Sequence, residues 1–173
     1  LRSNPGGLLF GGIDIARMWL DDGKIVSTAN RQGVGETSSA NQTAITDKPL
    51  VVLVDGGSAS ASEILSGALQ DNKRAKLVGA KTFGKGLVQS VRPLVDGAGM
   101  AVTVAKYYTP NGKDINHNGI KPDIEVKLTK DQIKTFVKDR TKVATLADPQ
   151  YAKALETLKI EIAARNGSAA QKK

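Results

Sequence analysis

Cysteine is absent from the 173-residue chain. Disulfides, cysteine metal ligands and thiol nucleophiles are therefore excluded, and an oxidising compartment is compatible because no thiol needs protection. No apolar run reaches the roughly 18 residues of a membrane span, so the sequence predicts no transmembrane helix. The single histidine, His117, lies in an Asn-His-Asn-Gly turn, which makes a histidine-based catalytic triad the weaker hypothesis.

Aromatic residues are also scarce, at 4%, whereas lysine and arginine give the chain a net charge of +8. Nucleic acid is the obvious partner of a basic protein. The cations are scattered, however, and no basic stripe carries interleaved stacking residues. The sequence predicts a solvated basic surface and no nucleic-acid partner, although the excess charge could attract an acidic partner or an anionic membrane surface.

The remaining composition is that of a globular protein, with 40% hydrophobic and 24% charged residues. Its length suffices for one domain with a core, or for a domain with a small appendage. The chain opens on Leu1 and a turn-like Arg-Ser-Asn-Pro-Gly-Gly run, so we expect a fragment or a processed product. The small, basic end over 167–173 is expected to be frayed.

Hydrophobic periodicity predicts an α/β core over 1–128 and a helical C-terminal extension over 129–173. We expect helices at 8–20 and 61–70 and strands at 24–27, 49–54, 75–78, 87–94, 100–108 and 123–128. The polar segment 30–46 is predicted to be one long loop. Asp148-Pro149 predicts the start of a further helix, with Leu155, Leu158 and Ile162 on its apolar face.

A run of small residues, Gly57-Ser-Ala-Ser-Ala-Ser-Glu63, follows the buried strand at 49–54. Such a turn places a hydroxyl at a helix N-terminus, where free backbone N–H groups can hold an anion, including the oxyanion of a tetrahedral intermediate. A purely structural interpretation is equally open, because Ser60 and Glu63 also match the S-x-x-E capping box.

A serine nucleophile needs a base, and lysine is the natural candidate if His117 is set aside. A free lysine has a pKa of about 10.4 and becomes a useful base only when burial lowers it towards about 7–8. Lys85 lies between two glycines, with Phe83, Leu87 and Val88 nearby. We therefore expect an apolar, fairly dry pocket around Lys85.

These segments together resemble the C-terminal processing (tail-specific) peptidases, which are serine endopeptidases with a Ser–Lys dyad. The resemblance rests on the run 56–63, on Thr82-Phe-Gly-Lys-Gly86 and on Gln89, with support from 1–7 and 118–123. It covers roughly residues 1–128. The family carries an upstream PDZ domain that binds the substrate's carboxyl end, and that domain is not within these 173 residues.

The resemblance implies a crotonase/Clp-protease-like fold, no cofactor, no metal, and protein substrates with exposed C-terminal tails. It also implies a periplasmic or plastid (thylakoid) lumen location, and leaves homo-oligomers and membrane-surface association open. The site residues that it implies are Ser60 as nucleophile, Lys85 as base, Gln89 as the residue orienting the lysine, and Ala61 with Gly6 (Gly7 as the alternative) as oxyanion-hole N–H donors.

Three other interpretations remain open. The segment 79–86 nearly matches a phosphate-binding P-loop, but Gly86 stands where a hydroxyl is required. The segment 114–125 matches the EF-hand pattern, with Asp114, Asn116, Asn118, the Ile120 carbonyl and Glu125 as the calcium ligands. Finally, the chain could be a non-catalytic binding or assembly module, although the complete set of Ser60, Lys85 and Gln89 favours an enzyme.

Overall fold

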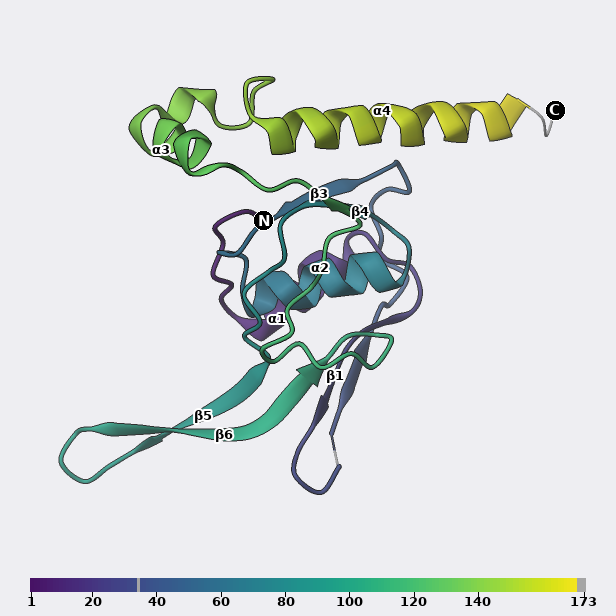
Figure 1. Ribbon diagram of the computed structural model, residues 1–173. Coiled ribbons are helices and arrows are strands. Elements are labelled where there is room, and N and C mark those ends of the chain that lie inside the picture. Colours follow the sequence, from purple (N-terminus) through teal and green to yellow (C-terminus); the bar gives the residue numbers. More distant parts are fainter. Residues whose placement is uncertain (34, 171–173) are drawn as a thin grey trace.

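The computed structural model describes residues 1–33 and 35–170. A parallel sheet of β3 (Val51–Val54), β4 (Lys76–Gly79) and β7 (Ile124–Glu125), in the order β3-β4-β7, forms its centre. Helix α4 (Pro149–Ala170) covers one face of this sheet and α2 (Ala61–Asp71) covers the other (Figure 1). Coverage on both faces explains why β3 is an unbroken apolar run, as the sequence predicted.

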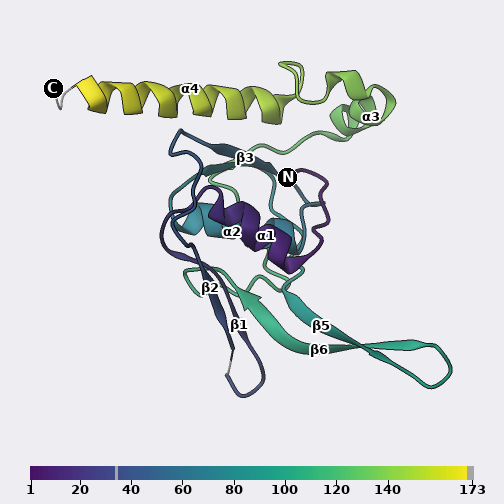
Figure 2. The same ribbon diagram turned by 180° about the vertical axis from the view of Figure 1, so that it is seen from behind.

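Helix α2 is almost wholly buried, because it lies between the sheet and α1 (Leu9–Arg17) (Figure 2). Its predicted inward residues are all buried: Ile64, Leu65, Ala68 and Leu69. On α1 and just after it, the buried residues Ile13, Ala16 and Leu20 also fall at the predicted helical spacing. These two helices and the sheet enclose the hydrophobic core of the described chain.

The predicted start of the last helix is confirmed in detail. Asp148 is fully buried, and its Oδ1 accepts hydrogen bonds from the backbone N–H groups of Gln150 and Tyr151 at the first turn of α4. Arg2 Nη2 donates to Asp148 Oδ2 at 2.6 Å, which ties the beginning of the chain to this helix. The residues that α4 buries most are Gln150, Ala154 and Thr157 rather than the predicted leucine stripe.

Two smaller helical segments, α3 (Lys130–Lys138) and the 3-10 turn η1 (Arg140–Lys142), connect β7 to α4. Strand β7 is shorter than the predicted 123–128 strand, although the alternating exposure continues to Leu128. At the other end, α4 continues through Ala170, and the fraying expected over 167–173 stays a prediction. The rest of the expected frayed end, 171–173, lies outside the described residues.

A second, antiparallel sheet lies below the core in Figure 1, in the order β2-β1-β6-β5. Its strands are β1 (Lys24–Ala29), β2 (Thr37–Ser39), β5 (Leu87–Pro93) and β6 (Gly99–Tyr108). The prediction of one long loop over 30–46 was wrong at β2, which pairs with β1. This strand is polar and has no hydrophobic period. Position 34 of that loop lies outside the described residues.

The hairpin of β5 and β6 projects away from the rest of the molecule (Figure 1). Several large apolar side chains on it are exposed: Val91, Leu94, Val95, Met100, Val102 and Val104. Within the described residues, no helix has the length and apolar character needed to cross a membrane.

Candidate active site

Ser60 lies at the N-cap of α2, directly after the turn that leaves β3, and its side chain is half-buried. Its backbone has φ 56° and ψ −119°, a conformation that residues with a Cβ rarely adopt. Such strained conformations cost about 1–3 kcal/mol and concentrate at functional sites. The turn thus presents the Ser60 hydroxyl at the helix N-terminus, as the small-residue run predicted.

Two backbone N–H groups flank this hydroxyl. That of Ala61, the first residue of α2, has no acceptor among the described residues. Gly6 packs against the same turn so closely that a Cβ on it would lie 2.5 Å from Ala59 O, 2.8 Å from Ala61 N and 2.9 Å from Ser60 Cβ. Gly7 has no such neighbours. Gly6 is therefore the better-placed oxyanion donor of the two candidates.

The Gly6 N–H is engaged in this structure, because it donates to Asn4 Oδ1 at 2.9 Å. The segment around it is fixed to the nucleophile turn by further bonds. Ala59 N–H donates to Asn4 O, and Asp55 accepts from the N–H of Ser3 and of Gly57. The oxyanion-hole candidates are thus brought together from the start of the chain and the β3–α2 turn.

The sequence predicted only a capping role for Glu63, and its second role in the candidate site is visible only in the structure. Its carboxylate is fully buried and accepts hydrogen bonds from Ser60 N–H, Lys85 N–H, Gly84 N–H and the Thr82 hydroxyl. One buried carboxylate therefore joins the nucleophile turn to the loop that carries the lysine. Glu63 forms its half of the capping box by accepting from Ser60 N–H, whereas the Ser60 hydroxyl makes no capping hydrogen bond. The box therefore does not compete with a catalytic role for Ser60.

The lysine loop is further supported by the segment that matched the EF-hand pattern. His117 N–H donates to Gly84 O, while Ile120 N–H donates to the Thr82 hydroxyl and its carbonyl accepts from Thr82 N–H. The backbones approach so closely that Gly84, at φ +94°, would place a Cβ 3.0 Å from His117 C. The Asn-Gly turn thus packs against the lysine loop through its backbone, and the His117 side chain is exposed.

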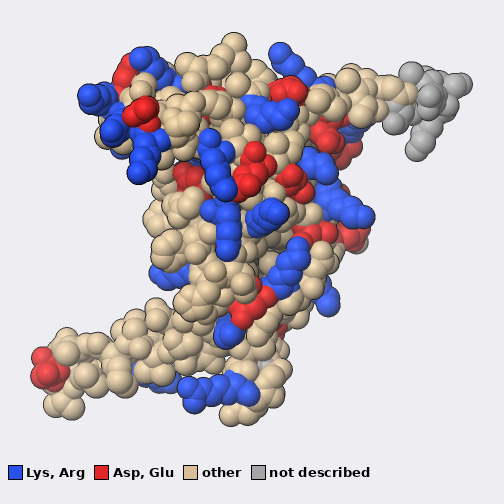
Figure 3. All heavy atoms as spheres, viewed as in Figure 1, with Lys and Arg blue, Asp and Glu red and all other residues tan. Residues whose placement is uncertain are grey.

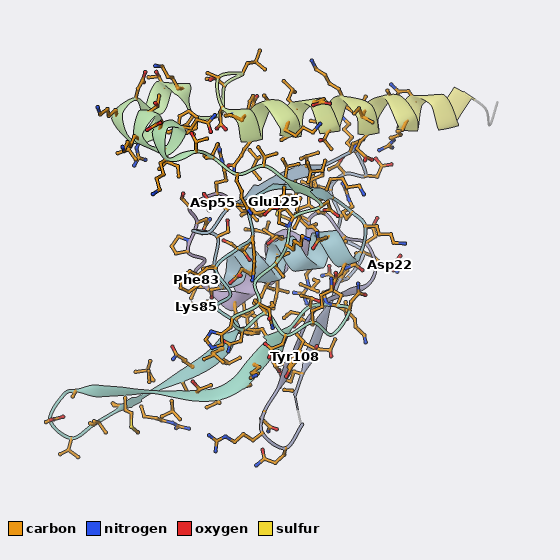
Figure 4. All side chains as sticks on the ribbon, viewed as in Figure 1. Asp22, Asp55, Phe83, Lys85, Tyr108 and Glu125 are labelled. Carbon is orange, nitrogen blue, oxygen red and sulfur yellow. The ribbon has the colours of Figure 1, made fainter. Side chains whose placement is uncertain are left out.

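The expectation of a dry pocket around Lys85 is not met. The Lys85 side chain is exposed, and its Nζ makes no hydrogen bond or ion pair with any described residue. Phe83 is 67% exposed, so it does not cover the lysine (Figure 4). The physical reason is that β5 begins directly after this loop and runs out into the projecting hairpin. No described element therefore lies over the Lys85 side chain.

Gln89 lies on β5 with its side chain exposed. No hydrogen bond joins it to Lys85 among the described residues. The structure thus brings Ser60, Ala61 and Gly6 together and places the Lys85 backbone beside them. It does not bring the Lys85 and Gln89 side chains into contact with Ser60.

The metal and nucleotide alternatives gain no support from these contacts. Asp114 is ion-paired with Lys106 at 2.8 Å, and Glu125 with Lys127 at 3.2 Å. Within residues 1–33 and 35–170, no three His, Asp or Glu side chains gather as a metal site would require. The P-loop candidate is followed by β5, whereas a P-loop needs a helix at that point.

Comparison with known proteins agrees with this geometry. Residues 1–126 match the model of peptidase family S41. A carboxyl-terminal-processing protease of Synechocystis sp. is 58% identical over 91% of this chain and 35% of its own length, and one of Picosynechococcus sp. is 68% identical over 71% and 30%. The chain thus spans about a third of the length of these curated relatives.

Solved structures show the same relationship. The photosystem II D1 C-terminal processing protease superposes with a TM-score of 0.68 at 51% identity, over 73% of this chain and 33% of that one. An S41 protease from Bacteroides fragilis, at 17% identity, shares the fold with a TM-score of 0.68. The α/β fold expected from the resemblance is therefore confirmed, and the chain belongs to peptidase family S41.

Proposed function

We propose that this chain is the catalytic part of a serine endopeptidase that cleaves proteins near their C-terminal tails. The observation that carries the proposal is the N-terminus of α2, where Ser60 has a strained backbone, Ala61 has a free N–H and Gly6 is in contact. Backbone N–H donors gathered beside a hydroxyl suit acyl transfer, because they can stabilise the oxyanion of the tetrahedral intermediate.

In the proposed mechanism, neutral Lys85 accepts the Ser60 proton while Ser60 Oγ attacks the peptide carbonyl. The N–H groups of Ala61 and Gly6 bind the oxyanion, which requires Gly6 to exchange Asn4 Oδ1 for the substrate. Protonated Lys85 then protonates the leaving amine, and water hydrolyses the acyl-enzyme in a second cycle. Gln89 is assigned to orient the lysine.

Lys85 must lose its contact with water before it can act as this base, since its side chain is exposed. Substrate binding over the loop 82–86 supplies a physical route, because excluding water disfavours the charged ammonium relative to the neutral amine. The names of the relatives support a substrate with an accessible C-terminal tail. A periplasmic or lumenal location is proposed on the same ground.

The test is cleavage of a protein with an unstructured apolar tail by the complete product of the gene. Wild type is compared with Ser60→Ala and Lys85→Ala, each checked for folding by circular dichroism. We expect both variants to lose nearly all cleavage, about 10³-fold or more. Wild-type rates in Lys85→Ala would show that the base is wrong.

The exposed, unbonded Lys85 side chain favours one second candidate, a non-catalytic binding module on the same fold. The same assay separates the two. If no tail of any composition is cut by the folded wild-type protein, the binding module becomes the better account of the chain.

A further inference from the structure

One of the two proposed oxyanion donors is already hydrogen-bonded in this structure. The Gly6 N–H donates to Asn4 Oδ1 at 2.9 Å, within the same loop. The Ala61 N–H has no acceptor among the described residues. Asn4 Oδ1 is a carbonyl oxygen, the same kind of atom that a peptide substrate would bring to this donor. The Asn4 side chain therefore lies where the substrate oxygen has to bind.

The Gly6 N–H cannot serve both oxygens at full strength. A hydrogen bond weakens steeply when its angle at the hydrogen falls below about 120°, so two acceptors of one N–H compete for the same direction. The lone pairs of the two oxygens also repel each other, and this repulsion grows as the substrate oxygen gains negative charge in the transition state. Turnover therefore requires the Asn4 amide to leave the Gly6 N–H.

Only the side chain of Asn4 has to move for this to happen, because the backbone around it is held in place. Ala59 N–H donates to Asn4 O at 3.0 Å, and Ser3 N–H donates to Asp55 Oδ1 at 2.8 Å. Asn4 is itself exposed, so its amide can rotate into water. Such a rotation frees the Gly6 N–H without displacing the loop from the nucleophile turn.

We propose that Asn4 is a latch on the oxyanion hole: its amide holds the Gly6 N–H while the site is empty and releases it to the carbonyl oxygen of a bound substrate. Asn4 acts through Gly6 and is thus a positioning residue. This inference rests on the proposed function and specifies how that site is regulated. The latch lowers kcat/KM, because kcat/KM compares the transition state with the free, latched enzyme.

The same hydrogen bond is also an Asx turn, which can simply shape the loop. Two substitutions separate these roles, because the roles predict opposite orders of activity. Asn4→Asp keeps an acceptor of nearly the same size, so a turn that only shapes the loop tolerates it. A latch becomes tighter in Asn4→Asp, since the charged acceptor binds the N–H more strongly and repels the oxyanion. Asn4→Ala removes the acceptor and opens the latch.

The experiment compares kcat/KM of wild type, Asn4→Ala and Asn4→Asp for a protein with an unstructured apolar tail. It uses the complete product of the gene, and circular dichroism checks that each variant is folded. We expect kcat/KM to rise about three- to tenfold in Asn4→Ala, as the removal of one competing hydrogen bond would give. In Asn4→Asp we expect a fall of about tenfold or more.

Asn30 supplies the matched control, because its Oδ1 accepts from Gln32 N–H at 2.9 Å in a turn of the same kind between β1 and β2. Lys and Arg side chains are spread over the face seen in Figure 3, so one carboxylate placed away from the candidate site changes the overall charge little. Asn30→Ala and Asn30→Asp should each leave kcat/KM within about twofold of wild type.

The latch and the proposed function fail in different ways. A fall of kcat/KM in Asn4→Ala overturns the latch, as does a wild-type value in Asn4→Asp or an equal fall in Asn30→Asp. With cleavage still dependent on Ser60, each of these results leaves the peptidase standing. Cleavage that persists unchanged in Ser60→Ala overturns the proposed function, and the latch with it.

Discussion

At the scale of single residues, the candidate site depends on buried groups outside the proposed Ser–Lys pair. Glu63 is the main one, because its buried carboxylate holds the nucleophile turn and the lysine loop in one arrangement. Buried acceptors of this kind specify geometry, since leaving any of their donors unpaired costs about 1–3 kcal/mol.

Glu63→Gln tests this role with almost no change in volume. A neutral amide offers one acceptor oxygen and an NH₂ group, so it cannot satisfy both pairs of donors: Ser60 and Lys85 N–H share one carboxylate oxygen, while Gly84 N–H and the Thr82 hydroxyl share the other. We expect a loss of about 2 kcal/mol in the free energy of unfolding and a lower kcat with little change in KM. Urea unfolding and steady-state kinetics measure the two effects.

Glu36→Gln is the matched control for this substitution, because the Glu36 side chain is exposed. Unchanged stability and kcat in Glu63→Gln would contradict the positioning role. A loss of the same size in Glu36→Gln would show that the effect is not specific to the site.

Gly6 and Gly7 form a second matched pair. Gly6→Ala should displace the turn, since φ is +91° and the new Cβ would meet Ala59 O at 2.5 Å. Gly7→Ala meets no neighbour within 4 Å and should be tolerated. We expect a fall of about 10²-fold in kcat for Gly6→Ala and less than about twofold for Gly7→Ala. The reverse order of effects would assign the oxyanion donor to Gly7.

At the scale of elements, one ion pair joins the start of the chain to the start of α4. Asp148 caps α4 and also pairs with Arg2, which belongs to the same N-terminal stretch as Gly6. Burial raises the pKa of Asp148, but the Arg2 guanidinium and backbone N–H groups outweigh it and hold the pKa below its usual value of 3.8.

This lowered pKa predicts a pH dependence. A carboxyl group whose pKa is lower in the folded state stabilises the fold at any pH above its pKa in the unfolded state. That stabilisation is lost as the pH falls through its pKa in the folded state. We therefore expect Asp148→Asn to be less stable than wild type by about 2–4 kcal/mol near neutral pH. The difference in the free energy of unfolding between the two proteins should disappear only below about pH 3.8, and urea unfolding at each pH measures it.

Asp22→Asn is the control for the pH series, because the Asp22 side chain is exposed and makes no hydrogen bond or ion pair with a described residue. A stability gap for Asp148→Asn that stays constant down to pH 2 would show that its charge does not contribute.

At the scale of the whole molecule, the β5–β6 hairpin forms an arm that projects away from the helix-covered core (Figure 2). An exposed two-stranded hairpin with apolar side chains is marginally stable alone and tends to associate. The base of the arm follows directly after the lysine loop.

This shape predicts concentration-dependent self-association of the 173-residue chain through the arm. Val95→Lys/Met100→Lys places charges on two exposed apolar positions and should shift the chain towards monomer. Sedimentation velocity over a concentration series measures the change. Ile160→Lys, on an exposed position of α4, is the control and should not alter the association. Equal association in all three proteins would exclude the arm as the contact.

Much of the fold was predictable because local chemistry determines it. The apolar run of β3, the helical spacing of Ile64, Leu65, Ala68 and Leu69, and the Asp148-Pro149 start each act over a few residues. Strand β2 was missed because its residues, Thr-Ser-Ser, carry no hydrophobic period and pair only through the backbone. The division at residue 128 stays a prediction.

The sequence alone determined which groups are available for chemistry: a serine at a helix start, a lysine between glycines, and no cysteine. Only the tertiary structure decided that Glu63 joins these segments, that Gly6 rather than Gly7 touches the nucleophile turn, and that the Lys85 side chain is exposed. The reason is physical: residue types and local spacing fix which groups are available, whereas burial and contact depend on segments that are distant in the chain and meet only when it folds.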